Sequence, residues 1–153
     1  MGLRDENGNG QVRMKLTIGE HAGFCFGVRR AVLKAFECAE KQLPCVTLGP
    51  LIHNPQEVER LRQAGIRSVD SLDEVAPGET VIIRSHGVTP QVYAQCEARG
   101  LSVIDATCPH VAHIHQLVQT YSEDGSAVVI VGEADHPEVV GIAGWAHGAV
   151  FIL

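Results

Sequence analysis

The sequence lacks the features that would assign the chain to a membrane or to a nucleic acid. Its apolar runs are far too short to span a bilayer. Its first residues lack the charged and apolar regions of a signal peptide. Basic residues are not in excess, because the formal net charge is −6 and the pI is about 5.7. Nothing therefore favours a nucleic acid or an anionic membrane as partner, and we expect a cytoplasmic protein.

Close cysteine pairs of the Cys-x-x-Cys type, which are typical of structural zinc sites, are also missing. The five cysteines are scattered and odd in number, which favours free thiols in a reducing compartment over disulfides. What remains is the composition of a globular protein, with 45% hydrophobic and 20% charged residues. The length of 153 residues is enough for one domain or for one and a part.

Two segments of the chain share one pattern, in which an apolar run is followed by small residues, a cysteine and a helical periodicity. Cys25 follows the apolar run at 14–18, and Cys108 follows the run at 101–104. A cysteine at the start of a helix lies beside unpaired N–H groups and the positive end of the helix dipole. This position favours the thiolate, so both cysteines are candidates for chemistry.

Three histidines occupy matching places after later apolar runs. His53 and His136 each follow their cysteine by 28 residues, and each precedes a proline. His86 likewise comes shortly before Pro90. The matched spacing predicts a duplicated α/β unit. Because ligands of parallel sheets bind at the carboxyl ends of the strands, we expect the two cysteines and three histidines to meet in one pocket.

The periodicity along the chain predicts alternating strands and helices, hence an α/β protein with repeated βα units and mainly parallel sheets. The expected strands cover residues 12–19, 45–48, 67–69, 80–83, 102–105 and 127–131, with another at 150–153. The expected helices cover residues 28–41, 55–64, 90–99, 109–122 and 137–145, with a capped turn at 71–74. Residues 1–11 are expected to form a disordered tail.

The remaining cysteines and histidines lack the repeated context and are predicted to be ordinary structural or surface residues. They are Cys38, Cys45, Cys96, His21, His110, His113, His115 and His147. Glu138 is different, since it lies two residues after His136. It either suits the dipole at the start of a helix or donates a proton in the same loop.

Two cysteines and three histidines are compatible with three kinds of site. The first is a non-enzymatic zinc-binding module, although zinc favours closer cysteine pairs. The second is a thiol-dependent hydrolase or transferase, which needs one cysteine with a histidine base and leaves the other cysteine unexplained. The third is an iron–sulfur cluster held by isolated cysteines from separate repeats, with the histidines free to bind substrate. Two thiolates are too few for a cubane cluster, so a third ligand would come from beyond residue 153 or from another chain.

Five segments, in order along the chain, resemble the 4-hydroxy-3-methylbut-2-enyl diphosphate reductase family, which catalyses the last step of the methylerythritol phosphate route to isoprenoids. The segments are Gly23-Phe24-Cys25-Phe26-Gly27-Val28 with Arg30-Ala31, Gly49-Pro50-Leu51-Ile52-His53-Asn54, Ser85-His86-Gly87-Val88, Asp105-Ala106-Thr107-Cys108-Pro109, and His136-Pro137-Glu138-Val139 with Gly141. They extend from about residue 16 to the end of the chain, and five separate matches make the resemblance specific.

The resemblance implies a cloverleaf of three related α/β domains with pseudo-threefold symmetry around one 4Fe-4S cluster. By this interpretation residues 12–105 form the first domain and residues 106–153 begin the second. The third domain is absent from this chain. We therefore expect the chain to be a fragment of a longer protein that is inactive by itself.

The resemblance also implies a role for each singled-out residue. Cys25 and Cys108 match cluster ligands, and Glu138 matches the acid that delivers protons as the C–O bond breaks. The residues that match the diphosphate-binding histidines of the family are His53, His86 and His136. The implied substrate is an allylic diphosphate that becomes isopentenyl and dimethylallyl diphosphate, with ferredoxin or flavodoxin as the electron donor.

Overall fold

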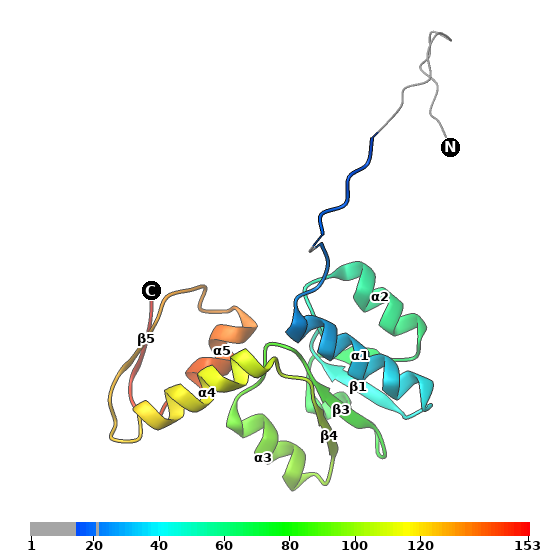
Figure 1. The fold of residues 1–153 in the computed structure, drawn as a ribbon. Helices are drawn as coiled ribbons and strands as arrows, with labels where there is room; N and C mark the ends of the chain where they lie inside the picture. Colours follow the sequence, from blue (N-terminus) through cyan, green and yellow to red (C-terminus); the bar gives the residue numbers. More distant parts are fainter. Residues whose placement is uncertain (1–14, 21) are drawn as a thin grey trace, which may run out of the picture.

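The computed structural model of the protein describes residues 15–20 and 22–153 (Figure 1). Its strands form a four-stranded and a two-stranded sheet, and every pairing in both is parallel. In chain order the elements are α1 (Phe26–Glu40), β1 (Cys45–Leu48), α2 (Pro55–Gln63), β2 (Arg67–Val69), the short 3₁₀ helix η1 (Leu72–Glu74), β3 (Thr80–Ile83), α3 (Pro90–Ala98), β4 (Ser102–Asp105), α4 (Pro109–Tyr121), β5 (Val128–Ile130), α5 (Pro137–Ala143) and β6 (Val150–Ile152). The expected α/β architecture with parallel strands is confirmed.

The larger sheet has the strand order β2-β1-β3-β4. The chain passes outward from β1 to β2 and then, on the other side, outward from β3 to β4. The order therefore reverses between β1 and β3. In open parallel sheets ligands bind beside the carboxyl ends of the two strands that flank such a reversal. The loops that carry His53 and His86 leave the sheet at these two ends.

Helices cover both faces of the larger sheet because successive side chains of its strands point to opposite sides. Ile82 packs with α1 and α2, whereas Val81 and Ile83 pack with α3 and η1, and all three are fully buried. Two apolar clusters therefore hold the sheet between helical layers. This packing fixes the carboxyl ends of β1 and β3 relative to α1.

A three-part unit occurs three times in the chain: a strand, a loop with a histidine, and a helix that begins with proline and leads to a second parallel strand. The units are β1-α2-β2, β3-α3-β4 and β5-α5-β6. Pro55, Pro90 and Pro137 are the first residues of their helices, where the missing N–H costs no hydrogen bond. The repetition predicted from the histidine and cysteine spacing is thus present in the backbone.

One expected strand is wrong in the part that the structure describes. Residues 15–19 of the strand expected at 12–19 are not extended in any sheet, and Leu16 and Ile18 are about four-fifths exposed (80% and 77%). The segment leads away from the helices and sheet (Figure 1). An apolar run forms a strand only where it pairs with the edge of another strand, and residues 15–19 pair with none among the described residues. Residues 12–14 and the tail expected at 1–11 lie outside the described residues.

The helices among the described residues are all too short or too polar to cross a bilayer. The longest is α1, with 15 residues.

Candidate functional site

Cys25 and Cys108 both occupy the N-cap position of a helix. Cys25 precedes α1 and Cys108 precedes α4, and neither side chain forms a capping hydrogen bond. Cys25 is exposed and Cys108 is half-buried. The thiols are therefore available to a ligand at the positive ends of two helix dipoles.

The two helix starts are in contact. A Cβ atom added to Gly27, which lies in the first turn of α1, would overlap the Sγ atom of Cys108. The side chain of Arg30 donates a hydrogen bond to the carbonyl oxygen of Thr107 at 2.9 Å, and Lys34 donates to that of Asp105. These bonds fasten α1 to the loop that carries Cys108. The structure thus brings the start of α1, which Cys25 precedes, into contact with the loop that carries Cys108.

The three predicted histidines also meet. Their ring centroids are 4.4 Å apart for His53 and His86, 5.4 Å for His53 and His136, and 5.8 Å for His86 and His136. The rings come from loops after three different strands, β1, β3 and β5. The three rings therefore form one cluster that draws on both sheets, although His53 and His136 are 83 positions apart in the sequence.

The environment of His86 disfavours a positive charge. Burial lowers its pKa from 6.5 to about 4, and the charges of His53, Arg84 and His136 act in the same direction. Its Nδ1 atom is buried and has no hydrogen-bond partner among the described residues. His86 is therefore neutral near pH 7 and has polar capacity that the chain itself does not use.

His136 is the N-cap of α5 and is held by that helix. Its Nδ1 atom accepts a hydrogen bond of 3.2 Å from the backbone N–H of Glu138. Because Nδ1 accepts, the proton of the neutral ring is on Nε2, which can donate to a ligand. Glu138 lies in the first turn of α5 and is half-buried. Its carboxylate forms no ion pair or side-chain hydrogen bond within the described part of the chain.

Comparison with known proteins shows the family to which the chain belongs. The family described as LytB protein matches residues 16–153. The chain belongs to the LytB protein family. The curated relatives of this LytB chain include the 4-hydroxy-3-methylbut-2-enyl diphosphate reductases of Geobacter sulfurreducens and Geobacter metallireducens. They are 49% and 47% identical over 140 residues, which is 92% of the LytB chain and 49% of each relative. The chain thus spans about half the length of the curated relatives it matches.

Solved structures show the same fold. The LytB chain superposes on a (E)-4-hydroxy-3-methyl-but-2-enyl diphosphate reductase, described as the terminal enzyme of the non-mevalonate pathway, with a TM-score of 0.77 and 46% identity. That match covers 90% of this chain and 50% of the other. The reductase of Plasmodium falciparum matches with a TM-score of 0.83 and 30% identity, over 88% of this chain and 42% of its own.

The site residues of this LytB chain do not complete a metal site by themselves. Across residues 15–20 and 22–153, no group of three or more His, Cys, Asp or Glu side chains is arranged to hold a metal ion. A zinc site built from Cys25, Cys108 and the histidines would need such a group. Any metal group held by the two thiols would need further ligands from outside the described residues.

The cysteines predicted to be structural are all buried in the LytB chain. Cys38, Cys45 and Cys96 are at most 4% exposed and belong to the two apolar clusters. Burial raises the pKa of Cys45 to about 11, with the neighbouring Cys38 acting in the same direction. Burial also raises the pKa of Cys96, so Cys45 and Cys96 are protonated and unreactive near pH 7.

Two residues beside the site were not predicted from the sequence. The Arg84 side chain lies across Gly49, at the start of the loop that carries His53, since a Cβ on Gly49 would be 2.5 Å from Nη1. His115, expected to be ordinary, is 4% exposed and packs under the loop that carries His86. In the sequence these two residues could have been suspected only from their positions, since Arg84 is two residues before His86 and His115 is two helical turns after Cys108.

Proposed function

We propose that the LytB protein to which these residues belong reduces 4-hydroxy-3-methylbut-2-enyl diphosphate to isopentenyl and dimethylallyl diphosphate. The observation that supports this most is the meeting of His53, His86 and His136 near the starts of two helices whose N-cap residues are cysteines. It occurs in a chain 49% identical to a curated reductase of that name. In the reaction the C–O bond of the substrate's hydroxymethyl group breaks, two electrons and two protons enter, and water leaves.

Cys25 and Cys108 are the proposed ligands of a 4Fe-4S cluster. Both are free thiols at helix N-termini, where the N–H groups stabilise the negative charge of thiolates and sulfides. The third thiolate then comes from outside the described residues. When bound, such a cluster supplies single electrons and an iron with Lewis-acid character.

The three histidines are the proposed binding site of the diphosphate. A neutral imidazole can donate an N–H group to a diphosphate without adding a positive charge to the free protein. His86 shows this, because burial and its neighbours lower its pKa to about 4. A bound diphosphate reverses the balance, since an adjacent anion favours the protonated ring. The site therefore gains positive charge when it is occupied, against the net charge of −6 of the whole chain.

Glu138 is the proposed proton donor. It is two residues from His136 in the first turn of α5, and no ion pair within the described residues fixes its carboxylate. A positioned carboxylic acid that delivers a proton to a leaving oxygen typically accelerates the step by about 10²–10⁴-fold.

The proposed electron donor is a ferredoxin or a flavodoxin, as in the family that the sequence resembles. We place the protein in the cytoplasm, because all five cysteines are free thiols and three of them lie in the cores.

The test is to purify the full-length protein without oxygen and to assay iron, acid-labile sulfide and zinc. Turnover is then measured with the allylic diphosphate and a chemically reduced one-electron donor, and the products are separated by chromatography. The expected result is a brown protein that contains iron and sulfide and forms both isomeric diphosphates. Cys25→Ser and Cys108→Ser should lose iron and turnover, whereas His113→Gln, an exposed change on α4, should retain both.

Two other outcomes identify the rival functions. A colourless protein that contains zinc and lacks turnover indicates the non-enzymatic metal-binding module. A metal-free protein whose hydrolase or transferase activity is lost on alkylation of one thiol indicates the thiol enzyme. Either result rejects the reductase.

A further inference from the structure

We propose that His115 is a positioning residue for the diphosphate site: its buried ring sets the position of the loop that carries His86 relative to α5, which carries His136. The inference rests on the proposed function and adds a residue to it. His115 itself does not touch the substrate. It acts through the backbone on which two of the three binding histidines are mounted.

The His115 ring is in contact with both elements. A Cβ added to Gly87 would lie 2.5 Å from Cε1 of His115, and one added to Gly141 would lie 3.5 Å from Nε2. Gly87 directly follows His86 and has a φ of +72°, and Gly141 is in α5. The same added Cβ on Gly141 would be 3.5 Å from the carbonyl oxygen of His86. The loop, α5 and the ring therefore meet at one place. Gly87 and Gly141 allow this contact because they have no side chain.

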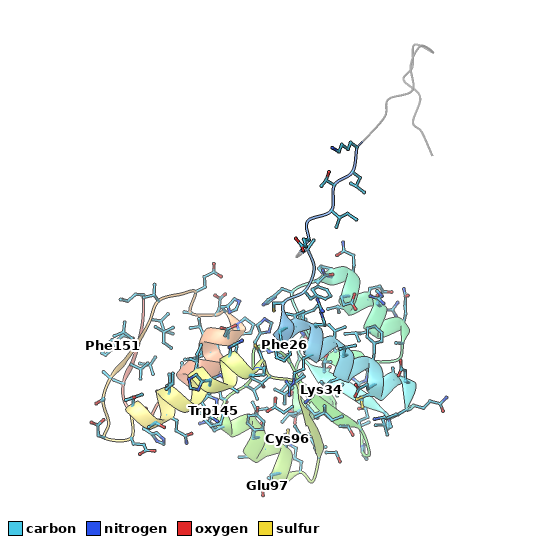
Figure 2. The ribbon with its side chains drawn as sticks, viewed as in Figure 1. Phe26, Lys34, Cys96, Glu97, Trp145 and Phe151 are labelled. Atoms are coloured by element: carbon cyan, nitrogen blue, oxygen red, sulfur yellow. The ribbon has the colours of Figure 1, made fainter. Side chains whose placement is uncertain are left out.

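Trp145 stacks on the ring of His115. It lies beside α4 and α5 (Figure 2), and its ring is stacked on His115 with centroids 5.3 Å apart and an interplanar angle of 19°. Its indole N–H donates a hydrogen bond of 3.0 Å to the carbonyl oxygen of Val88, two residues after His86. The loop is thus held by the His115 ring at Gly87 and by the Trp145 side chain at Val88.

The contribution of His115 is one of shape rather than of hydrogen bonding. The ring is 4% exposed, and its Nε2 atom is buried without a partner in the described residues. A buried polar atom without a partner does not stabilise the fold, so an apolar ring of similar size can take its place. A small side chain cannot, because it leaves a cavity into which the loop and α5 can move. Phenylalanine should therefore preserve the site, and alanine should not.

The experiment compares His115→Phe and His115→Ala in the full-length protein, with His113→Gln as the matched control on the exposed side of α4. Two quantities are measured: KM and kcat with the allylic diphosphate, and the dissociation constant of inorganic pyrophosphate by calorimetry. Iron content and the visible spectrum show whether the cluster loads normally. For His115→Ala we expect KM and the pyrophosphate dissociation constant to rise by about 10–100-fold, the effect of weakening a hydrogen bond to the charged diphosphate. We expect kcat to change far less, His115→Phe to restore tight binding, and the control to match the wild type.

Each result supports or overturns the inference. Wild-type binding in His115→Ala overturns it, and so does a loss in His115→Phe as large as that in alanine, which would assign His115 a role through its nitrogen atoms. If His115→Ala does not fold, Trp145→Phe provides the second test, because it keeps a ring beside His115 but removes the bond to Val88. Trp145→Phe should raise KM and the pyrophosphate dissociation constant by a smaller factor than His115→Ala does. If both quantities stay unchanged, the inference is overturned. A wild-type protein without reductase activity rejects the proposed function itself, which is a distinguishable outcome.

Discussion

At the scale of single residues, Glu138 combines two features that a proton donor needs. Its backbone N–H holds Nδ1 of His136, so the loop geometry is fixed, while its carboxylate is free of ion pairs in the described residues. We expect Glu138→Gln to leave the affinity for the diphosphate unchanged, because the amide keeps the size of the side chain. Turnover should fall by about 10²–10⁴-fold, since the amide cannot donate the proton.

The measurement is single-turnover and steady-state kinetics of the full-length protein, with iron content as a check on cluster loading. Glu133→Gln is the control, as Glu133 is an exposed carboxylate near the same loop. Undiminished turnover in Glu138→Gln would remove this residue from the mechanism.

The second prediction at this scale concerns acid stability. Burial lowers the pKa of His86 from 6.5 to about 4, and burial also lowers the pKa of His115. Between about pH 4 and pH 6.5 the unfolded chain, in which His86 has its ordinary pKa, binds more protons than the folded chain. The free energy of unfolding should therefore be at its full value above about pH 6.5 and fall as the pH is lowered toward about 4.

Urea unfolding of the 153-residue chain at a series of pH values measures this slope. His86→Asn should flatten this dependence and leave only the contribution of His115. His113→Asn should not, because His113 is exposed on α4. A slope that is the same in wild type and His86→Asn would mean that His86 does not carry the effect.

Sequence patterns predicted the residues that a repeat marks. Cys25 and His53 share their spacing with Cys108 and His136, and His86 shares the proline context; in the structure the three histidine rings meet, and the first turn of α1, which Cys25 precedes, touches Cys108. The same patterns left His115 among the ordinary residues, because its contacts come from Gly87, Gly141 and Trp145, which are distant in the sequence. A local sequence periodicity cannot predict a contact between residues so far apart in the chain.

At the scale of elements, the start of α1 and Cys108 fit together because Gly27 has no side chain. Alanine in a helix is normally about 1 kcal/mol more favourable than glycine. At this position its Cβ would overlap Sγ of Cys108, so Gly27→Ala should instead destabilise the chain by about 1–3 kcal/mol, the usual cost of overpacking. It should also lower the iron content of the full-length protein, because the displaced thiol is a proposed ligand.

Chemical unfolding and iron analysis of Gly27→Ala measure the two effects. Gly19→Ala is the control, since among the described residues the nearest heavy atom to a Cβ there is 3.9 Å away. A Gly27→Ala protein with normal stability and a full complement of iron would show that the contact with Cys108 does not matter.

Most elements were predictable because both ends are marked by local chemistry. Proline at the first helical position and glycine after the last turn bound α2 and α3 within about a residue. The capped turn at 71–74 is a 3₁₀ helix with the capping box that its Ser71 and Glu74 predict. The strand expected at 12–19 failed in its described part because an apolar run specifies a strand only together with a partner edge, which a local pattern does not contain.

At the scale of the whole molecule, the two sheets are unequally protected. The larger sheet lies between helical layers, and Val81, Ile82 and Ile83 in its centre are fully buried. The sheet of β5 and β6 has two strands, and its paired residues Val129 and Phe151 (Figure 2) are 60% and 55% exposed. The core of the 153-residue chain is therefore the sheet that carries His53 and His86, while His136 depends on the smaller one.

The difference in burial between the two sheets predicts which part of the 153-residue chain unfolds first. Two paired strands with an exposed apolar face are marginally stable in water, so the backbone amides of β5 and β6 should exchange with deuterium through local opening of low free energy. The amides of β1 and β3 should exchange only with global unfolding. Hydrogen exchange followed by mass spectrometry at the peptide level measures both, with α4 as an internal reference for the region between the sheets. If β5 and β6 are protected as strongly as β1 and β3, the two sheets unfold as one unit. The loop that carries His136 would then be as firmly placed as those that carry His53 and His86.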